Sequence, residues 1–97
     1  MYYYSAAEVK DRVPEELQIA LEKAIMVYEQ AKFYFENKIK TGEADETIAE
    51  AGQMANEAWL QYRKVNTIVS EYIKKRYIRK DVMETLVLAY NIPSTVH

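Results

Sequence analysis

Five basic residues gather between positions 74 and 80 and form the densest cluster of chemically capable side chains in the sequence. They are Lys74, Lys75, Arg76, Arg79 and Lys80. Such a cluster binds phosphate groups through charge, and a neighbouring tyrosine, Tyr77, can stack on a nucleic-acid base. A second interpretation is that these cations stabilise the end of a helix, where the helix dipole is negative. The cluster therefore predicts nucleic-acid binding as the alternative function of this chain and not as its main one.

The residue types that most enzymes use for catalysis are nearly absent. The only histidine is His97, the last residue, and there is no cysteine. The body of the chain therefore has no histidine–carboxylate pair, no thiolate nucleophile and no Glu-x-x-His metal motif. The acidic residues Glu43, Asp45 and Glu46 lie together but lack the spacing of a calcium loop. We expect a protein that is not an enzyme and that uses no metal and no cofactor.

One polar residue, Asn66, falls on the apolar face of the longest predicted helix. A single asparagine in this position can set the register between helices, because its amide must find hydrogen bonds there. Asn66 is therefore a candidate register-setting residue. The alternative is an amide that is satisfied inside the chain by Tyr28, by a backbone carbonyl or by water.

The first long helix carries a second apolar row, opposite its main seam. The row consists of Ile19, Met26 and Phe33, which are spaced by seven residues. An apolar row that faces water is typical of an interaction surface. Either the short terminal helices of the same chain or a second chain would cover it. Because two copies can bury the same row on each subunit, we predict a homodimer with these residues at its interface. Association with a different protein partner stays open.

These residues are positioned by two long predicted helices. The longer runs from about Asp45 to Ile78, with an apolar seam at alternating spacings of three and four residues. The other runs from Pro14 to about Ile39 and has a seam of its own. The short turn between them contains Gly42, which commonly ends a helix in the left-handed conformation. A turn this short makes the helices antiparallel neighbours.

Two short helices are predicted to flank the hairpin. Ser5 and Glu8 have the spacing of a capping box at the start of a helix over about 6–12. A last helix over about 81–90 begins with Asp81 as its expected cap, and Asp45 or Thr47 is expected to cap the longest helix.

The fold class is therefore all-α. We predict one domain over residues 1–97, a long antiparallel hairpin with short flanking helices that forms a helical bundle on dimerisation.

Side-chain sizes support the pairing of the two long helices. Folding about Gly42 sets Tyr34 and Phe35 against a small-residue stretch that includes Gly52, and sets Ala31 near Trp59. Large residues then face small ones, as close packing requires.

Charge and hydropathy limit the kinds of partner that this chain can have. Residues 1–62 carry six Lys/Arg and twelve Asp/Glu, whereas residues 63–97 carry seven Lys/Arg and three Asp/Glu. The first part therefore has a negative net charge and the second a positive one. No apolar run reaches the roughly 18 residues of a membrane span, and the start of the chain lacks the regions of a secretory signal. We expect a cytoplasmic, small, non-enzymatic interaction or regulatory protein, such as an adaptor, an inhibitor or an assembly subunit.

Overall fold

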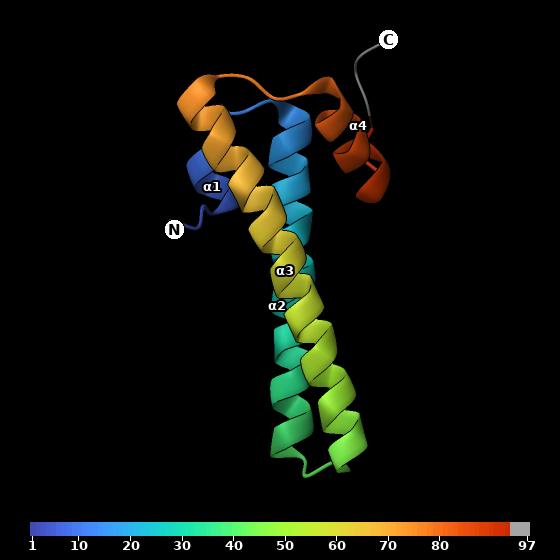
Figure 1. Ribbon diagram of the computed structural model, residues 1–97. Helices are drawn as coiled ribbons and strands as arrows, with labels where there is room; N and C mark the ends of the chain where they lie inside the picture. The colour runs from blue at the N-terminus through green and yellow to red at the C-terminus, as the bar shows by residue number, and fades with distance from the viewer. Residues whose placement is uncertain (94–97) are drawn as a thin grey trace.

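The structure is a computed structural model that describes residues 1–93, and these residues form four α-helices and no strand. The helices are α1 (Ala6–Val9), α2 (Glu15–Lys40), α3 (Asp45–Lys75) and α4 (Lys80–Ala89). The two long helices, α2 and α3, run antiparallel and pack against each other (Figure 1). The predicted all-α hairpin with short flanking helices is confirmed.

The molecule has a wide end and a narrow end, and its principal extents are 48 × 27 × 18 Å. At the wide end, which we call the head, α1 and α4 lie on opposite sides of the hairpin (Figure 1). The Lys23 ammonium donates to the Tyr90 carbonyl at 2.9 Å and ties the end of α4 to α2. Below the head, only α2 and α3 continue toward the turn, and we call this part the stalk.

The main apolar core lies in the head. Its buried members are Val9, Leu17, Ala20, Leu21, Ala24, Val65, Val69, Leu86 and Ile92. Below it, the buried apolar residues in the described part of the chain are two alanines, Ala51 and Ala58. The head therefore buries branched side chains from all four helices, whereas the stalk is held by contacts between small residues and half-buried aromatic rings.

The ends of the first two helices follow from local conformation. Ser5 caps α1 as predicted, because its hydroxyl accepts the Glu8 amide while the Glu8 carboxylate accepts the Ser5 amide. The predicted extension of this helix to residue 12 is wrong, since Asp11 takes a left-handed φ of 64° and the chain turns toward Pro14. Gly42 adopts a φ of 66° in the turn after α2, as predicted.

The predicted ends of the later helices need correction. The helix α3 stops at Lys75 and not at Ile78, because Arg76 adopts a left-handed φ of 56°. Neither Asp45 nor Thr47 caps α3, and Asp81 does not cap α4. The capping positions are Ala44 and Arg79, and neither makes a side-chain cap hydrogen bond. Asp45 and Asp81 instead lie in the first turns, where a negative charge interacts favourably with the helix dipole.

The predicted pairing of the long helices holds at Gly52. A Cβ atom built on Gly52 would lie 3.1 Å from Cε1 of Phe35, so glycine permits this close approach. Tyr34 departs from the prediction. Its side chain is 45% exposed, and the Lys38 ammonium lies 5.0 Å from its ring centroid.

Candidate functional site

The segment Met1–Ser5 precedes the first helix and lies against α3, and we call it the N-terminal strap. Asn66 is fully buried under it. The side-chain oxygen of Asn66 accepts the Tyr4 amide at 2.8 Å, and its nitrogen donates to the Tyr2 carbonyl at 2.8 Å. The amide is thus satisfied inside the chain by backbone groups, one of the two alternatives that the sequence left open.

We call the two hydrogen bonds between Asn66 and the strap the Asn66 clamp. Four aromatic rings meet next to it. They belong to Tyr3 of the strap, Tyr28 of α2, and Trp59 and Tyr62 of α3. The Trp59 ring lies 4.9 Å from that of Tyr3 and 5.4 Å from that of Tyr28, between centroids. Trp59 is half-buried beside Tyr28, and its indole is not fully enclosed.

The hydroxyl of Tyr62 connects the aromatic cluster to the strap. It donates to the Tyr4 carbonyl at 3.0 Å. Burial raises the pKa of the Tyr62 phenol, and nearby negative charges such as that of Glu8 act in the same direction. Tyr62 therefore stays protonated at neutral pH and keeps its role as a donor.

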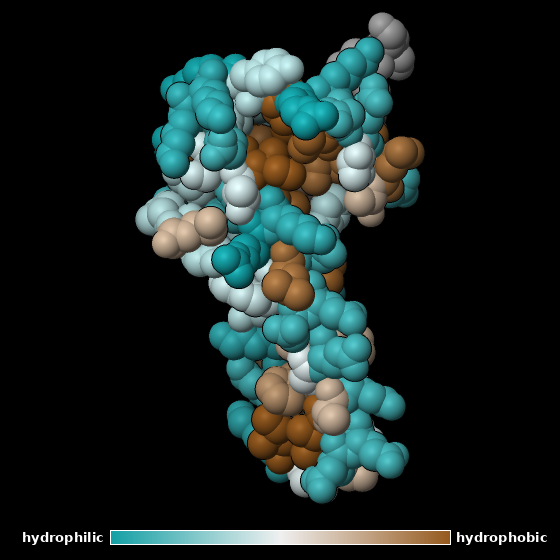
Figure 2. All heavy atoms as spheres, in the orientation of Figure 1, coloured by the Kyte–Doolittle hydropathy of each residue, from teal (hydrophilic) through white to brown (hydrophobic). Residues whose placement is uncertain are grey.

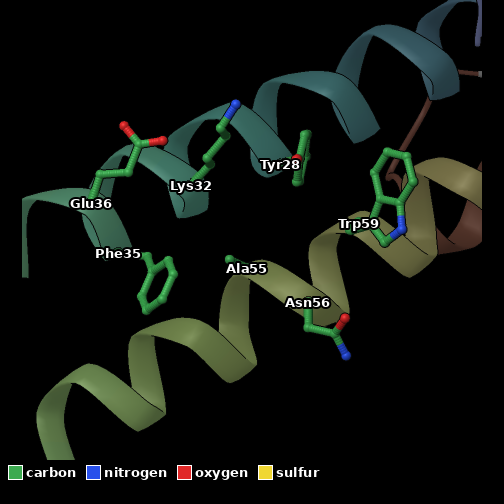
Figure 3. A pocket seen from close by; sticks show the side chains of 7 residues that line it. All are labelled: Tyr28, Lys32, Phe35, Glu36, Ala55, Asn56 and Trp59. Carbon is green, nitrogen blue, oxygen red and sulfur yellow. The ribbon is translucent and has the colours of Figure 1, made fainter. Parts of the chain in front are cut away.

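A hollow of about 440 Å³ opens in the stalk beside the aromatic cluster. Figure 3 shows Phe35 at one end, Tyr28 and Trp59 at the other, and Ala55 between them. The polar side chains at its edges are Lys32, Glu36 and Asn56. Apolar walls with a few polar edge groups are typical of a binding surface.

The candidate interface row is partly covered. Ile19 is half-buried and packs against the head core. Met26 and Phe33 are 51% and 66% exposed. The structure therefore keeps two of the three residues exposed. On the face drawn in Figure 2, apolar surface is visible near the tip of the stalk and between α3 and α4 in the head.

The basic cluster spans the junction between α3 and α4. Lys74 and Lys75 lie in the last turn of α3, where cations interact favourably with the helix dipole. All five basic side chains are exposed. The Lys75 ammonium lies 3.0 Å from the Glu71 carboxylate, and the Arg79 guanidinium lies 2.8 Å from the Asp81 carboxylate. Two of the five basic side chains are therefore paired with carboxylates.

Metal sites and membrane spans are absent from residues 1–93. These residues contain no group of three histidine, cysteine or acidic side chains placed to hold a metal ion. None of the helices described there combines the length and apolar character needed to cross a membrane. His97, the only histidine, lies outside the described residues.

Sequence reasoning missed the strap. The available signal was the run of three tyrosines just before the Ser5 cap, since bulky aromatic residues next to a helix start usually need a surface to pack on. No known protein-family model matches the chain, and no curated protein or solved structure was found to be similar to it.

Proposed function

We propose that this protein is a small helical interaction or regulatory protein, an adaptor, an inhibitor or an assembly subunit, that acts by helix–helix association and not by catalysis. The observation that supports this function is the exposure of Phe33, on the two-helix stalk, and of Met26, which lies beside Ser5 and Ala6 where the stalk meets the head. Water contact with large apolar side chains is unfavourable by about 25 cal/mol per Å². A further helix layer against α2 would remove this surface from water.

We propose a second copy of the chain as the partner that supplies this layer. Two stalks packed about a twofold axis form a four-helix bundle and bury the same surface on each subunit. Because Ile19 is held by its own head, an antiparallel crossing between residues 26 and 33 is favoured. This crossing sets Met26 of one copy against Phe33 of the other. Glu22, Glu29 and Lys32 would lie at the edge of the contact and contribute little energy.

Substitution of Met26 tests this proposal. We expect Met26→Glu to be helical and monomeric, because a charge at the centre of an apolar contact is costly while the α2–α3 seam is untouched. The matched control is Ala49→Glu, which adds the same charge to an exposed position of α3.

Analytical ultracentrifugation measures the outcome. We expect the wild type and Ala49→Glu to dimerise at about 100 μM, and Met26→Glu to dimerise at least about 100-fold more weakly. A monomeric wild type at this concentration, or a Met26→Glu variant that dimerises as well as the wild type, would contradict the proposed homodimer.

Nucleic-acid binding at the α3–α4 junction is the second candidate function. The observation that favours it is a hollow of about 300 Å³ whose lining includes Lys75, Tyr77 and Arg79. Tyr77 is 65% exposed and can stack on a base. Phosphates would then contact Lys74, Arg76 and Lys80, which lie next to this hollow in sequence.

Salt dependence distinguishes this second function. If these three side chains contact phosphates, changing all of them to Gln should reduce the magnitude of the slope of log affinity against log salt by about two for single-stranded DNA. The control is the triple variant Lys10→Gln, Lys40→Gln and Arg63→Gln, which removes the same charge elsewhere and should keep the slope. A wild type that fails to bind heparin or single-stranded DNA at low salt would eliminate this function.

A further inference from the structure

The Asn66 clamp recognises peptide backbone. Its amide bonds the carbonyl of Tyr2 and the N–H of Tyr4, the two groups on either side of Tyr3. These are backbone groups that a neighbouring strand uses when a peptide adds to the edge of a sheet. They are the same in every peptide except at proline, so the clamp holds an extended segment regardless of its side chains.

The aromatic cluster recognises the residue at the centre of that segment. The Tyr3 ring lies 4.9 Å from the ring of Trp59 and 5.7 Å from that of Tyr62, between centroids. The Tyr62 hydroxyl adds a third backbone contact, to the Tyr4 carbonyl at 3.0 Å. Aromatic pairs at such distances contribute about 0.5–1.5 kcal/mol beyond their area burial. Three backbone contacts and one aromatic position thus define the bound segment.

We propose that Asn66, Trp59 and Tyr62 form a binding site for an extended peptide segment of a partner protein with an aromatic residue at its centre, and that the N-terminal strap fills this site in cis. The strap then acts as an internal competitor. Neither Met26 nor Phe33 belongs to this site, although Met26 lines a hollow with Ser5 at the end of the strap. The proposed peptide site does not require the proposed homodimer.

Two features allow a partner segment to displace the strap. The strap begins with poorly covered residues, since Met1 and Tyr2 are 73% and 60% exposed. The strap also leaves the 440 Å³ hollow next to Trp59 unfilled. A partner segment that places an apolar side chain between Trp59 and Phe35 gains contacts that the strap does not make. The apparent association constant of the partner segment equals its intrinsic value multiplied by the fraction of molecules in which the strap has left the site.

Peptide binding by a full-length variant with a disabled strap tests the proposal. Tyr3→Ala removes the central ring, and Tyr4→Pro removes the N–H that bonds Asn66. Both changes are made in the Met26→Glu chain, so that stalk pairing does not contribute. The probe is a labelled peptide of sequence Met-Tyr-Tyr-Tyr-Ser with blocked ends, followed by fluorescence anisotropy. Trp59, the only tryptophan, reports on the site directly through its emission.

We expect the disabled-strap variant to bind this peptide at least about tenfold more tightly than the same chain with an intact strap. A peptide with alanine at its centre, or the addition of Asn66→Ala to the protein, should weaken binding about tenfold or more. The matched control is Tyr3→Phe, which keeps the ring and should bind the probe as weakly as the intact strap does.

Circular dichroism establishes first that each variant is helical. A helical disabled-strap variant that does not bind the peptide overturns the proposal, and so does binding that is insensitive to both Asn66→Ala and the central residue. A Met26→Glu chain that dimerises through its strap would identify a second copy as the occupant and would overturn the assignment to a partner protein. Failure of the homodimer test leaves these outcomes unaffected.

Discussion

Glu8 joins two local structures through its carboxylate. It accepts the Ser5 amide within the capping box and a hydrogen bond from the Tyr2 hydroxyl of the strap. The Tyr2 bond, followed by the Ser5 bond, lowers the pKa of Glu8 below its ordinary value. The same bond raises the pKa of the Tyr2 phenol.

Removing the Tyr2 hydroxyl should therefore change the titration of Glu8. We expect Tyr2→Phe to raise the pKa of Glu8 toward its ordinary value, as measured by NMR titration of the carboxyl carbon. In the wild type, a folded-state pKa below the unfolded one means that ionised Glu8 stabilises the fold above the unfolded-state pKa. That contribution is lost as the pH falls through the folded-state pKa.

The control for this titration is Tyr3→Phe, because within residues 1–93 the Glu8 carboxylate accepts hydrogen bonds from Tyr2 and Ser5 and not from the Tyr3 hydroxyl. It should leave the pKa of Glu8 unchanged. An unaltered Glu8 pKa in Tyr2→Phe would show that the strap does not bond the carboxylate in solution.

The Phe35 ring of α2 packs directly on Gly52 of α3. Glycine inside a helix is less favourable than alanine by about 1 kcal/mol. An alanine Cβ at position 52 would lie 3.1 Å from Cε1 and 3.4 Å from Cζ of Phe35. The Phe35 ring borders the hollow of Figure 3 and therefore has room to shift.

We expect Gly52→Ala to raise the free energy of unfolding by about 0.5 kcal/mol, because the gain in helix propensity exceeds the cost of moving the ring. Gly52→Val should lower the free energy of unfolding, since the branched side chain collides with the Phe35 ring and fits a helix less well. Urea unfolding followed by circular dichroism measures both variants. Destabilisation by Gly52→Ala would mean that the Phe35 ring is held rigidly in place.

The two ends of the molecule differ in how much apolar surface they bury. The head core contains Leu17, Leu21, Val65 and Val69, which are almost fully buried, whereas the stalk buries alanines. Local opening requires less free energy where fewer apolar contacts are broken. The stalk of a single chain should therefore open before the head does.

Native-state hydrogen exchange tests this difference and its link to dimerisation. In Met26→Glu, we expect amides of α2 and α3 near Gly42 to exchange at a lower free energy of opening than those around Leu21 and Val69. If the wild type forms the proposed homodimer, protection near residues 26–33 should be higher in the wild type than in Met26→Glu, while protection in the head should be the same in both. Equal protection of stalk and head in the monomeric variant would show that the stalk is stable without a partner.

The sequence alone determines the hairpin. Apolar residues at alternating spacings of three and four indicate two long helices, and Gly42 marks the turn between them. The pairing of Phe35 with Gly52 also follows, because the turn sets the register and large residues must face small ones. The predicted caps at Asp45 and Asp81 failed, because acidic residues favour the first helical turn as well as the cap position.

Only the tertiary structure decides which surfaces remain open. Periodicity places Ile19, Met26 and Phe33 in one row, but it cannot show that the head covers Ile19 and leaves the other two exposed. The strap likewise has no periodic pattern, and its amide partner Asn66 is 62 residues away from Tyr4. Periodicity reports the apolar face of each helix, which is a local property. Covering such a face depends on contacts between distant segments, and these form only when the whole chain folds.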